Sequence, residues 1–407
     1  MANELWVFSE KSGFLAELIA GGRMLAEKMQ GSVTALVLGA REEAEKAVSM
    51  GADKVLWLGE PDPAGMVEDY VPTIANLVED QKPKLLLIGA TKRGKAVAGR
   101  LGGRLGCTTI CATAMRELPY GIPKMIVSTL ASGNTRWHID ISDIILIPSL
   151  LDIGGLNPMI QMVLNNAAYA IAGMVKGHRP YHSSGKKVVS VTMYGTTTPG
   201  VSRAREVVEE AGYEVWVFHA SGVGGRTMEK LMSMGRIQGV MDMTLAEIGA
   251  HLVGGLHDAG PHRMEEASGL GIPQVIVPGA ADTIVLPPRD QVPEKFKNRR
   301  LNFHNPTMTT MRTTAEENTQ IATFIAEKLN RAKGPVCVIF PLGGLSSIDR
   351  PGKIFYDPEA NRALFSTLKQ KLNPKIEIIE DEHHLDDPEF AVRVGESMIR
   401  LMKQKHP

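Results

Sequence analysis

The feature that most constrains the fold of this chain is a strand, a glycine-rich loop and a helix in succession, best seen between residues 212 and 229. The apolar run at 215–218 predicts a buried strand, and the loop after it contains Gly222, Gly224 and Gly225, followed by Arg226. Glycine lets the backbone approach a ligand closely, and the first N–H groups of a helix attract anions. The pattern is typical of a phosphate site, and it also occurs as a tight turn that binds nothing.

The same alternation runs through most of the chain. In the first quarter it predicts strands at 5–8, 33–38, 55–58 and 85–88, with helices at 15–29, 42–50 and 66–79. Because these apolar runs lack a regular polar alternation, they indicate strands buried on both faces, as in a parallel sheet covered by helices. We therefore predict an α/β protein of two domains, each with a mainly parallel, Rossmann-like sheet flanked by helices.

Domain limits follow from the length and from one break in the pattern. A chain of 407 residues is expected to form two or three domains. Residues 179–186 include Pro180 and a pair of serines, which predict a linker. The first domain is therefore expected at 1–178 and the second at 187–407. A long, alanine-rich apolar helix at 158–175 is expected to be well buried in the first domain.

Composition restricts the class of protein. The formal net charge is zero, from 45 basic and 45 acidic residues, which argues against a nucleic-acid partner. No signal peptide and no apolar run of about 18 residues is visible, so we expect a cytoplasmic protein without a membrane partner. Cys107, Cys111 and Cys337 suggest no disulfide framework, and a redox or metal pair at Cys107 and Cys111 is the less favoured interpretation. No metal site is predicted.

Threonine and glycine residues follow several predicted strands of the second domain. Three threonines follow a strand at 187–193, and a predicted helix at 201–211 then leads to the strand of the glycine-rich loop. Because the carboxyl ends of parallel strands meet at one edge of a sheet, two adjacent units of this kind favour a phosphate-bearing ligand there, although the hydroxyls can also cap a helix. An arginine suited to bidentate phosphate contact and two glycines after a strand at 336–340 complete the set. The predicted nucleotide-binding residues are Thr196, Thr197, Thr198, Gly222, Gly224, Gly225, Arg226, Arg312, Gly343 and Gly344.

Three further residues are candidates for catalysis. Asp242 lies at the end of a predicted strand at 240–243, and Asp282 follows a predicted strand at 274–277. A carboxylate at either place can act as a base, bind Mg²⁺ or cap the next helix. His304 lies in a long run, 287–318, that is expected to be irregular and for that reason functional. A histidine there can transfer protons near neutral pH, although a lone histidine is more often structural. No catalytic role is assigned among them.

The first 110 residues resemble the N-terminal domain of the electron transfer flavoprotein alpha subunit. The matching runs are LWVFSEKSGFLAELIAGGRMLA, SVTALVLG, GADKVLWLG and KPKLLLIGATKRGKAVAGRLGGRLGCTTI. In that family this domain is mainly a scaffold, and a separate C-terminal domain holds the flavin. Nothing in this sequence resembles that flavin domain, so FAD is not expected.

From residue 111 onwards the chain resembles the Tm-one-like ATP-binding family. The matching runs are ATAMRELPYGIPKMIVSTLASG, DIILIPSLLDIGGLNPM, MYGTTTPGVSRARE, GYEVWVFHASGVGGRTME, GIPQVIVPGAADT, HNPTMTTMRTTAEEN and PLGGLSSIDRPGKIFYDPEA. This resemblance implies ATP binding and a homo-oligomer. The change of resemblance near residue 110 suggests a chimera, with a join within 101–111 and a first domain that combines 1–110 with 111–178.

Three functions therefore remain open from the sequence. The first is a protein that binds ATP, with or without Mg²⁺, through the glycine- and threonine-rich loops. The second is an enzyme that uses the same pocket to act on a small phosphorylated or carboxylated metabolite. The third is a subunit similar to the flavoprotein alpha chain. The sequence contains no Walker A motif, nucleophile elbow or paired metal motif that would name a reaction.

Overall fold

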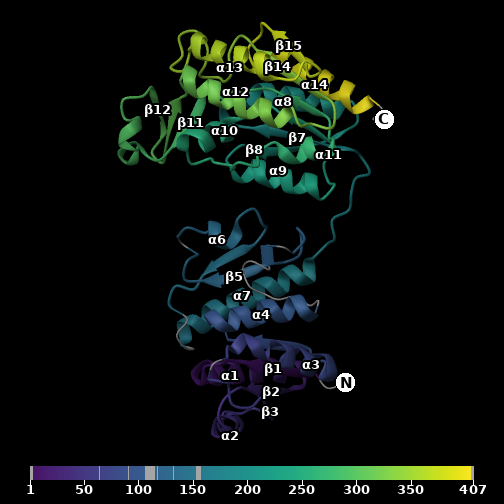
Figure 1. Cartoon of the computed structure of the whole chain (residues 1–407), viewed down its shortest axis with the longest axis vertical. Coiled ribbons are helices and arrows are strands. Elements are labelled where there is room, and N and C mark those ends of the chain that lie inside the picture. Colours follow the sequence, from purple (N-terminus) through teal and green to yellow (C-terminus); the bar gives the residue numbers. More distant parts are fainter. Residues whose placement is uncertain are drawn as a thin grey trace. The chain divides into compact units, whose positions relative to one another are not determined.

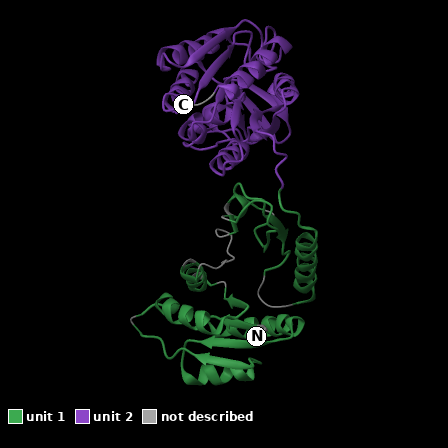
Figure 2. Cartoon of the chain, turned by 90° about the vertical axis from the view of Figure 1, so that its right-hand side faces the viewer, with its two compact units in different colours: residues 1–181 green, residues 182–407 purple. Residues whose placement is uncertain are grey.

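The computed structural model describes residues 3–63, 65–89, 91–105, 115–116, 118–131, 133–152 and 157–404. The chain divides into two compact units, residues 1–181 and residues 182–407 (Figure 2). Both units are built from parallel strands and flanking helices, so the predicted α/β class is confirmed. Cys107, Cys111 and residues 106–111 of the predicted join lie outside the described residues.

A four-stranded parallel sheet in the order β3-β2-β1-β4 forms the N-terminal part of unit 1 (Figure 1). Its elements are β1 (Asn3–Phe8), α1 (Ser12–Met29), β2 (Gly31–Val37), α2 (Arg41–Ser49), β3 (Lys54–Trp57), the 3-10 helix η1 (Val67–Tyr70), α3 (Val71–Gln81), β4 (Leu85–Ile88) and α4 (Lys92–Leu105). Leu5 and Val7 of β1 pack toward α1 and α2, whereas Trp6 and Phe8 pack toward α3 and α4. The central strand is therefore buried on both faces, as its unbroken apolar run predicts.

The rest of unit 1 is a smaller assembly around a two-stranded parallel sheet. Its elements are β5 (Met125–Ser128), α6 (Arg136–Ile139), β6 (Ile145–Pro148) and α7 (Pro158–Gly177). The buried ammonium of Lys124 donates to the carbonyls of Pro119 and Ile122 and lies 2.7 Å from a carboxylate oxygen of Asp143. The expectation that α7 is well buried is wrong, because Tyr169 is 79% exposed and only one stripe of the helix packs on the sheet.

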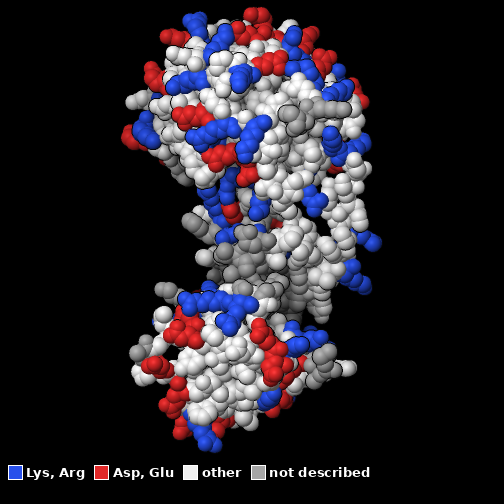
Figure 3. All heavy atoms as spheres, turned by 45° about the vertical axis from the view of Figure 1, so that its right-hand side comes forward, with Lys and Arg blue, Asp and Glu red and all other residues white. Residues whose placement is uncertain are grey.

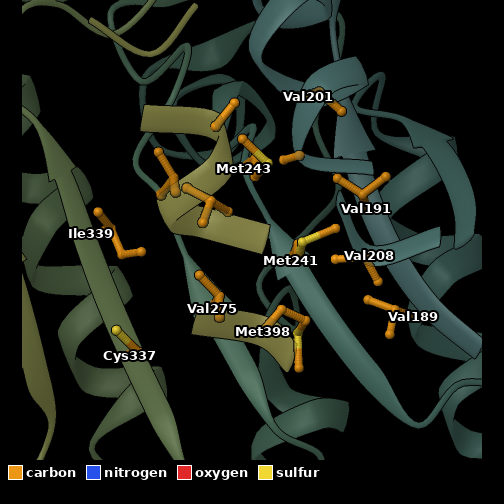
Figure 4. Close-up of a cluster of buried hydrophobic side chains, with 14 of the residues drawn as sticks. Val189, Val191, Val201, Val208, Met241, Met243, Val275, Cys337, Ile339 and Met398 are labelled. Carbon is orange, nitrogen blue, oxygen red and sulfur yellow. The ribbon is translucent and has the colours of Figure 1, made fainter. Parts of the chain in front are cut away.

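Unit 2 contains a six-stranded parallel sheet in the order β15-β14-β10-β9-β7-β8. Its strands are β7 (Val188–Met193), β8 (Glu214–His219), β9 (Gly239–Asp242), β10 (Gln274–Ile276), β14 (Val336–Pro341) and β15 (Glu377–Asp381). Helices α8 (Thr198–Glu210) and α14 (Pro388–Lys403) cover one face, where valines and methionines of the strands meet them (Figure 4). The other face carries α9 (Val223–Ser233), α11 (Glu265–Leu270), α12 (Ala315–Leu329) and α13 (Pro358–Lys371).

A three-stranded antiparallel sheet projects from unit 2 (Figure 1). It consists of β11 (Thr283–Leu286), β12 (Leu301–Asn305) and β13 (Met308–Arg312), in the order β11-β13-β12. The expectation of an irregular run at 287–318 is therefore wrong, since β12 and β13 form a hairpin there and α12 begins at Ala315. A short turn at Asn305, whose side chain accepts from the Thr307 amide, closes the hairpin.

The remaining properties are the surface charge of unit 2 and the length and apolar character of the helices. On the face of unit 2 shown in Figure 3, basic and acidic side chains are interspersed, in keeping with a formal net charge of zero. Within the described parts of the chain, no helix combines the length and the apolar character that a membrane crossing requires.

Candidate functional site

The order of the strands in unit 2 identifies the edge where a ligand is expected. After β7 the chain adds β8 on one side and then β9 on the other, so the direction of winding reverses between β7 and β9. In open parallel sheets, ligands bind outside the carboxyl ends of the strands at such a reversal. The loops after β7 and β14 meet across this edge, where the Ser347 amide donates to the Thr196 carbonyl at 2.8 Å.

The three predicted threonines differ in what their hydroxyls contact. Thr198 donates to the Tyr194 carbonyl at 2.8 Å, and Thr197 shares a hydrogen bond of 2.9 Å with Thr244 in the loop after β9. The buried hydroxyl oxygen of Thr196 has no hydrogen-bond partner among the described residues. Of the three, Thr196 is therefore the one whose buried hydroxyl the protein itself does not use.

The glycine-rich loop binds a carboxylate side chain of the protein itself, that of Glu247. The amides of Gly222 and Gly225 donate to one carboxylate oxygen of Glu247, at 2.6 and 3.1 Å. A Cβ at Gly225 would lie 2.1 Å from the other oxygen of Glu247, and a Cβ at Gly224 would lie 1.8 Å from the His219 carbonyl. Half-buried Arg226 lies in the first turn of α9. The loop thus has the geometry expected of an anion site, with a carboxylate where the sequence predicts phosphate.

Glu247 belongs to a buried ionic cluster that the sequence analysis missed. Glu247 lies on α10 (Ala246–Gly249), which continues into the π-helix η3 (Ala250–Gly254). The guanidinium of Arg263 donates to Glu247, Asp242 and Glu229, at 2.9, 2.8 and 3.2 Å. Burial alone would lower the pKa of Arg263, but the three carboxylates raise it well above its ordinary value. Arg263 is therefore a permanent cation that holds together the ends of β9, α9 and α10.

Like Glu247, the carboxylates of Asp242 and Glu229 have hydrogen-bond partners besides Arg263. Asp242 also accepts from the Thr192 hydroxyl at 2.7 Å, so both of its oxygens are occupied. Glu229 accepts from the amides of Met264 and Glu266 at the start of α11. Burial raises the pKa of Glu229, and Arg263 opposes that shift. Asp242, a predicted catalytic candidate, is thus tied into an internal ion network.

Asp282, the second predicted carboxylate, is in a different state. It is fully buried after β10, and one of its oxygens accepts from the Ser346 hydroxyl at 2.7 Å. Its other oxygen has no hydrogen-bond partner in the described ranges of the chain. Burial raises the pKa of Asp282 to about 6, with Arg312 opposing the shift and Asp349 adding to it. Asp282 is therefore a carboxyl group that changes charge close to physiological pH.

The remaining predicted residues have structural contacts. Arg312 donates to the carbonyls of Phe355, Thr313 and Asp357 and to the side chains of Thr313 and Asn361, so its guanidinium braces β13 against the start of α13. Gly344 has a φ of +137°, and a Cβ there would lie 2.1 Å from the Asp349 carbonyl. The Gly343 amide donates to the His383 carbonyl at 3.1 Å. His304 is exposed on β12.

A stacked pair of rings at the ends of β7 and β8 was also missed. The rings of Tyr194 and His219 lie 5.3 Å apart at an angle of 20°, and the Tyr194 hydroxyl is 3.0 Å from Nδ1 of His257. The available signal was positional, since Tyr194 directly follows one strand and His219 ends its neighbour. The sequence analysis considered only glycine and threonine at these positions.

The fold is that of a two-domain α/β protein whose second sheet reverses its direction of winding between β7 and β9. The chain matches the N-terminal domain of an uncharacterised protein family, UPF0261, at residues 23–180, and the C-terminal domain of the same family at residues 186–402. It therefore belongs to the UPF0261 family. The N-terminal match crosses residue 110, where the sequence analysis predicts a join.

Curated relatives agree with this assignment. A UPF0261 protein of Clostridium tetani is 49% identical over 305 residues, which are 75% of this chain and 75% of the relative. The ToMV resistance protein Tm-1(GCR237) of Solanum lycopersicum is 43% identical over 319 residues, which are 76% of this chain and 42% of that longer protein. A UPF0261 protein of Mesorhizobium japonicum is 40% identical over 302 residues, 74% of this chain and 75% of the relative. The predicted likeness to Tm-1 proteins is confirmed, whereas the flavoprotein likeness and the chimera stay predictions.

Proposed function

We propose that unit 2 binds a nucleotide, with Mg²⁺-ATP as the first ligand to test, at the carboxyl edge of the sheet between β7 and β10. The observation that carries the proposal is a set of buried oxygens without a partner in the described chain. They are the side-chain oxygens Oγ1 of Thr196, Oδ1 of Asp282 and Oγ1 of Thr283. Buried polar atoms in proteins are nearly always hydrogen-bonded, so three exceptions at one edge favour a ligand that completes them.

The chemistry of these groups suits a metal-bound polyphosphate. A threonine hydroxyl donates to a phosphate oxygen, and a carboxylate oxygen is a preferred ligand of Mg²⁺. Asp282 and Thr196 belong to loops that are tied together through residues 346 and 347, because Ser346 donates to Asp282 and Ser347 donates to Thr196. In this proposal the amides of Gly222 and Gly225 keep Glu247, and the ligand lies on the neighbouring loops.

The test is calorimetric titration of the purified protein with ATP and MgCl₂, alongside Thr196→Val. This substitution removes one hydroxyl without changing the shape of the side chain. A lost hydrogen bond to a charged group weakens binding by roughly 10- to 100-fold. Thr319→Val at an exposed position of α12 is the matched control, since the Thr319 hydroxyl donates to the Ala315 carbonyl of its own helix. Wild-type protein that is folded and does not bind ATP, or equal binding by Thr196→Val, would refute the proposal.

A second function, catalysis on the bound ligand, is favoured by the state of Asp282. A carboxyl group whose pKa is raised to about 6 can accept and release a proton near neutral pH. Release of inorganic phosphate from ATP, measured for the wild type and for Asp282→Asn, separates an enzyme from a binding protein. Turnover that disappears in Asp282→Asn supports catalysis, whereas saturable binding without turnover in the wild type excludes ATP hydrolysis.

A further inference from the structure

The Tyr194–His219 pair forms a flat aromatic surface at the edge of the sheet. Met193 and His219 are partners in the pairing of β7 with β8, so the two rings lie on adjacent strands. Tyr194 is only 8% exposed and packs on Ala220 and Val285. His219 stacks on the Tyr194 ring and is itself exposed to solvent. Tyr194 is therefore the buried ring of this pair, and His219 is the ring that solvent can reach.

The position of Tyr194 is fixed by His257. The two rings meet edge to face at 82°, and the Tyr194 hydroxyl lies 3.0 Å from Nδ1 of His257. Burial raises the pKa of Tyr194 and lowers the pKa of His257 to about 4, so both groups are neutral at physiological pH. The hydrogen bond between the Tyr194 hydroxyl and Nδ1 of His257 holds the phenol ring in place next to His219.

The distance from this surface to the partnerless oxygens matches an extended ligand. His219 ends β8, Thr196 follows β7 and Asp282 follows β10, and the strands lie in the order β8-β7-β9-β10. Three strand spacings separate the two ends, which is roughly 15 Å. An extended nucleoside triphosphate has a comparable length from its base to its last phosphate.

We propose that the exposed ring of His219 is the stacking platform for the base of the nucleotide that binds at this edge. The inference rests on the proposed function, because Thr196 and Asp282 hold the phosphates and the metal in it. Aromatic side chains stack on the π-face that every base presents, and His is among the side chains that do so. The ligand lies along the sheet edge, with its base over β8 and its phosphates toward β10.

The experiment compares Mg²⁺-ATP with Mg²⁺-tripolyphosphate, which lacks the base and the sugar, by calorimetric titration. Stacking of a base on one aromatic side chain contributes about 1–3 kcal/mol, so His219→Ala is expected to weaken ATP binding roughly 5- to 150-fold. The affinity for tripolyphosphate should stay unchanged, and His219→Phe should restore ATP binding. His262→Ala is the matched control, since that side chain is 85% exposed and pairs with Glu265 on the surface.

Each result decides between the platform and the phosphate site. If the wild type binds both ligands and His219→Ala weakens neither, the platform is refuted and the phosphate site stands. If His219→Ala weakens both ligands equally, His219 does not stack on a base, and the inference fails in the same way. If the wild type binds neither ligand, both proposals fail. A ring-current shift of the His219 ring protons in the NMR spectrum, produced by ATP and absent with tripolyphosphate, is the positive signature.

Discussion

The two units are both parallel α/β assemblies, but the parallel strands of unit 2 form one six-stranded sheet, whereas the described strands of unit 1 form a four-stranded and a two-stranded sheet. In unit 2, β10 and β14 have neighbours on both sides and their residues are almost fully buried. In unit 1, the order β3-β2-β1-β4 ends at β4, and β5 pairs only with β6 among the described strands. The apolar β4 therefore has Leu85 36% exposed and its other residues half-buried.

The helices show the same difference. Helix α14 in unit 2 buries Phe390, Val394 and Met398 completely against the sheet. Helix α7 in unit 1 is the more apolar helix of the two, yet Met162 is 48% and Val175 is 61% exposed. An apolar sequence thus shows that an element can be buried, whereas the sheet available to it decides how much of it is buried.

The largest predicted effect concerns the ionic cluster of unit 2. Arg263→Leu leaves Asp242, Glu229 and Glu247 buried without their cation, which costs about 3–5 kcal/mol. Hydrogen exchange measured by mass spectrometry should show faster exchange throughout unit 2 and unchanged exchange in unit 1. Arg205→Leu, which removes an exposed pair with Glu209 on α8, should cost less than about 1 kcal/mol. Equal losses in the two units would show that they unfold together.

The next effect is a stabilisation that depends on pH. The folded chain holds the proton of Asp282 more tightly than the unfolded chain, whose pKa is about 3.9. Stability therefore falls as the pH rises toward about 6, and it stays reduced above that pH. Asp282→Asn should stabilise unit 2 by up to about 3 kcal/mol at pH 7 and by almost nothing near pH 4.

Urea unfolding between pH 4 and pH 8 measures this difference. The exposed Asp290→Asn is the control, and it should stay within about 0.5 kcal/mol of the wild type at every pH. A gain from Asp282→Asn that does not change between pH 4 and pH 7 would mean that the raised pKa of Asp282 is not its cause.

A smaller effect separates two glycines in helices of the two units. Gly225→Ala places a Cβ 2.1 Å from Glu247 and 2.6 Å from Arg263, and should destabilise unit 2 by about 1–3 kcal/mol. Gly21→Ala in α1 of unit 1 meets no atom within 4 Å and should stabilise by about 0.5–1 kcal/mol. Thermal unfolding of the two variants measures both signs. A neutral Gly225→Ala would show that Glu247 can leave the loop at little cost.

The smallest predicted effect tests the open edge of unit 1. Leu85→Thr on β4 should cost no more than about 0.5 kcal/mol, because the side chain is already 36% exposed and threonine suits a strand. Chemical denaturation monitored by circular dichroism gives the value. A loss above about 2 kcal/mol would mean that β4 is covered in solution, and the contrast with β10 would then disappear.

The sequence predicted the repeating local pattern and missed the long-range partners. It identified β1 to β4 of the sheet in unit 1, all strands of the parallel sheet in unit 2 except β15, and the anion-binding geometry of the loop at Gly222–Gly225, because these follow from residues close together in the chain. It did not identify Glu247 as the anion, since the two amides that bind it lie 25 and 22 residues away. The acceptors of Arg312 lie as far as 49 residues along the chain, and only the folded chain brings them together.

The exposure of α7 and the antiparallel sheet of β11, β13 and β12 were not predicted, for a different physical reason. Their residues satisfy local preferences for helix and strand, but the surface on which they pack is set by strand order, which local pattern does not encode. Tyr194 and His219 at the ends of β7 and β8 were missed because these two stacked rings lie on neighbouring strands but are far apart in the sequence. Distances of this kind follow only from the register of the sheet.

Glu247 also competes with anions in solution for binding to the glycine-rich loop. A carboxylate tethered beside two amides acts as an intramolecular competitor, with an effective concentration in at least the millimolar range. Free phosphate and sulfate at ordinary cellular concentrations have to displace it and break its bond with Arg263 as well. An external anion therefore binds this loop only if it displaces Glu247, and the N-terminal end of the α9 dipole interacts with a carboxylate of the protein itself.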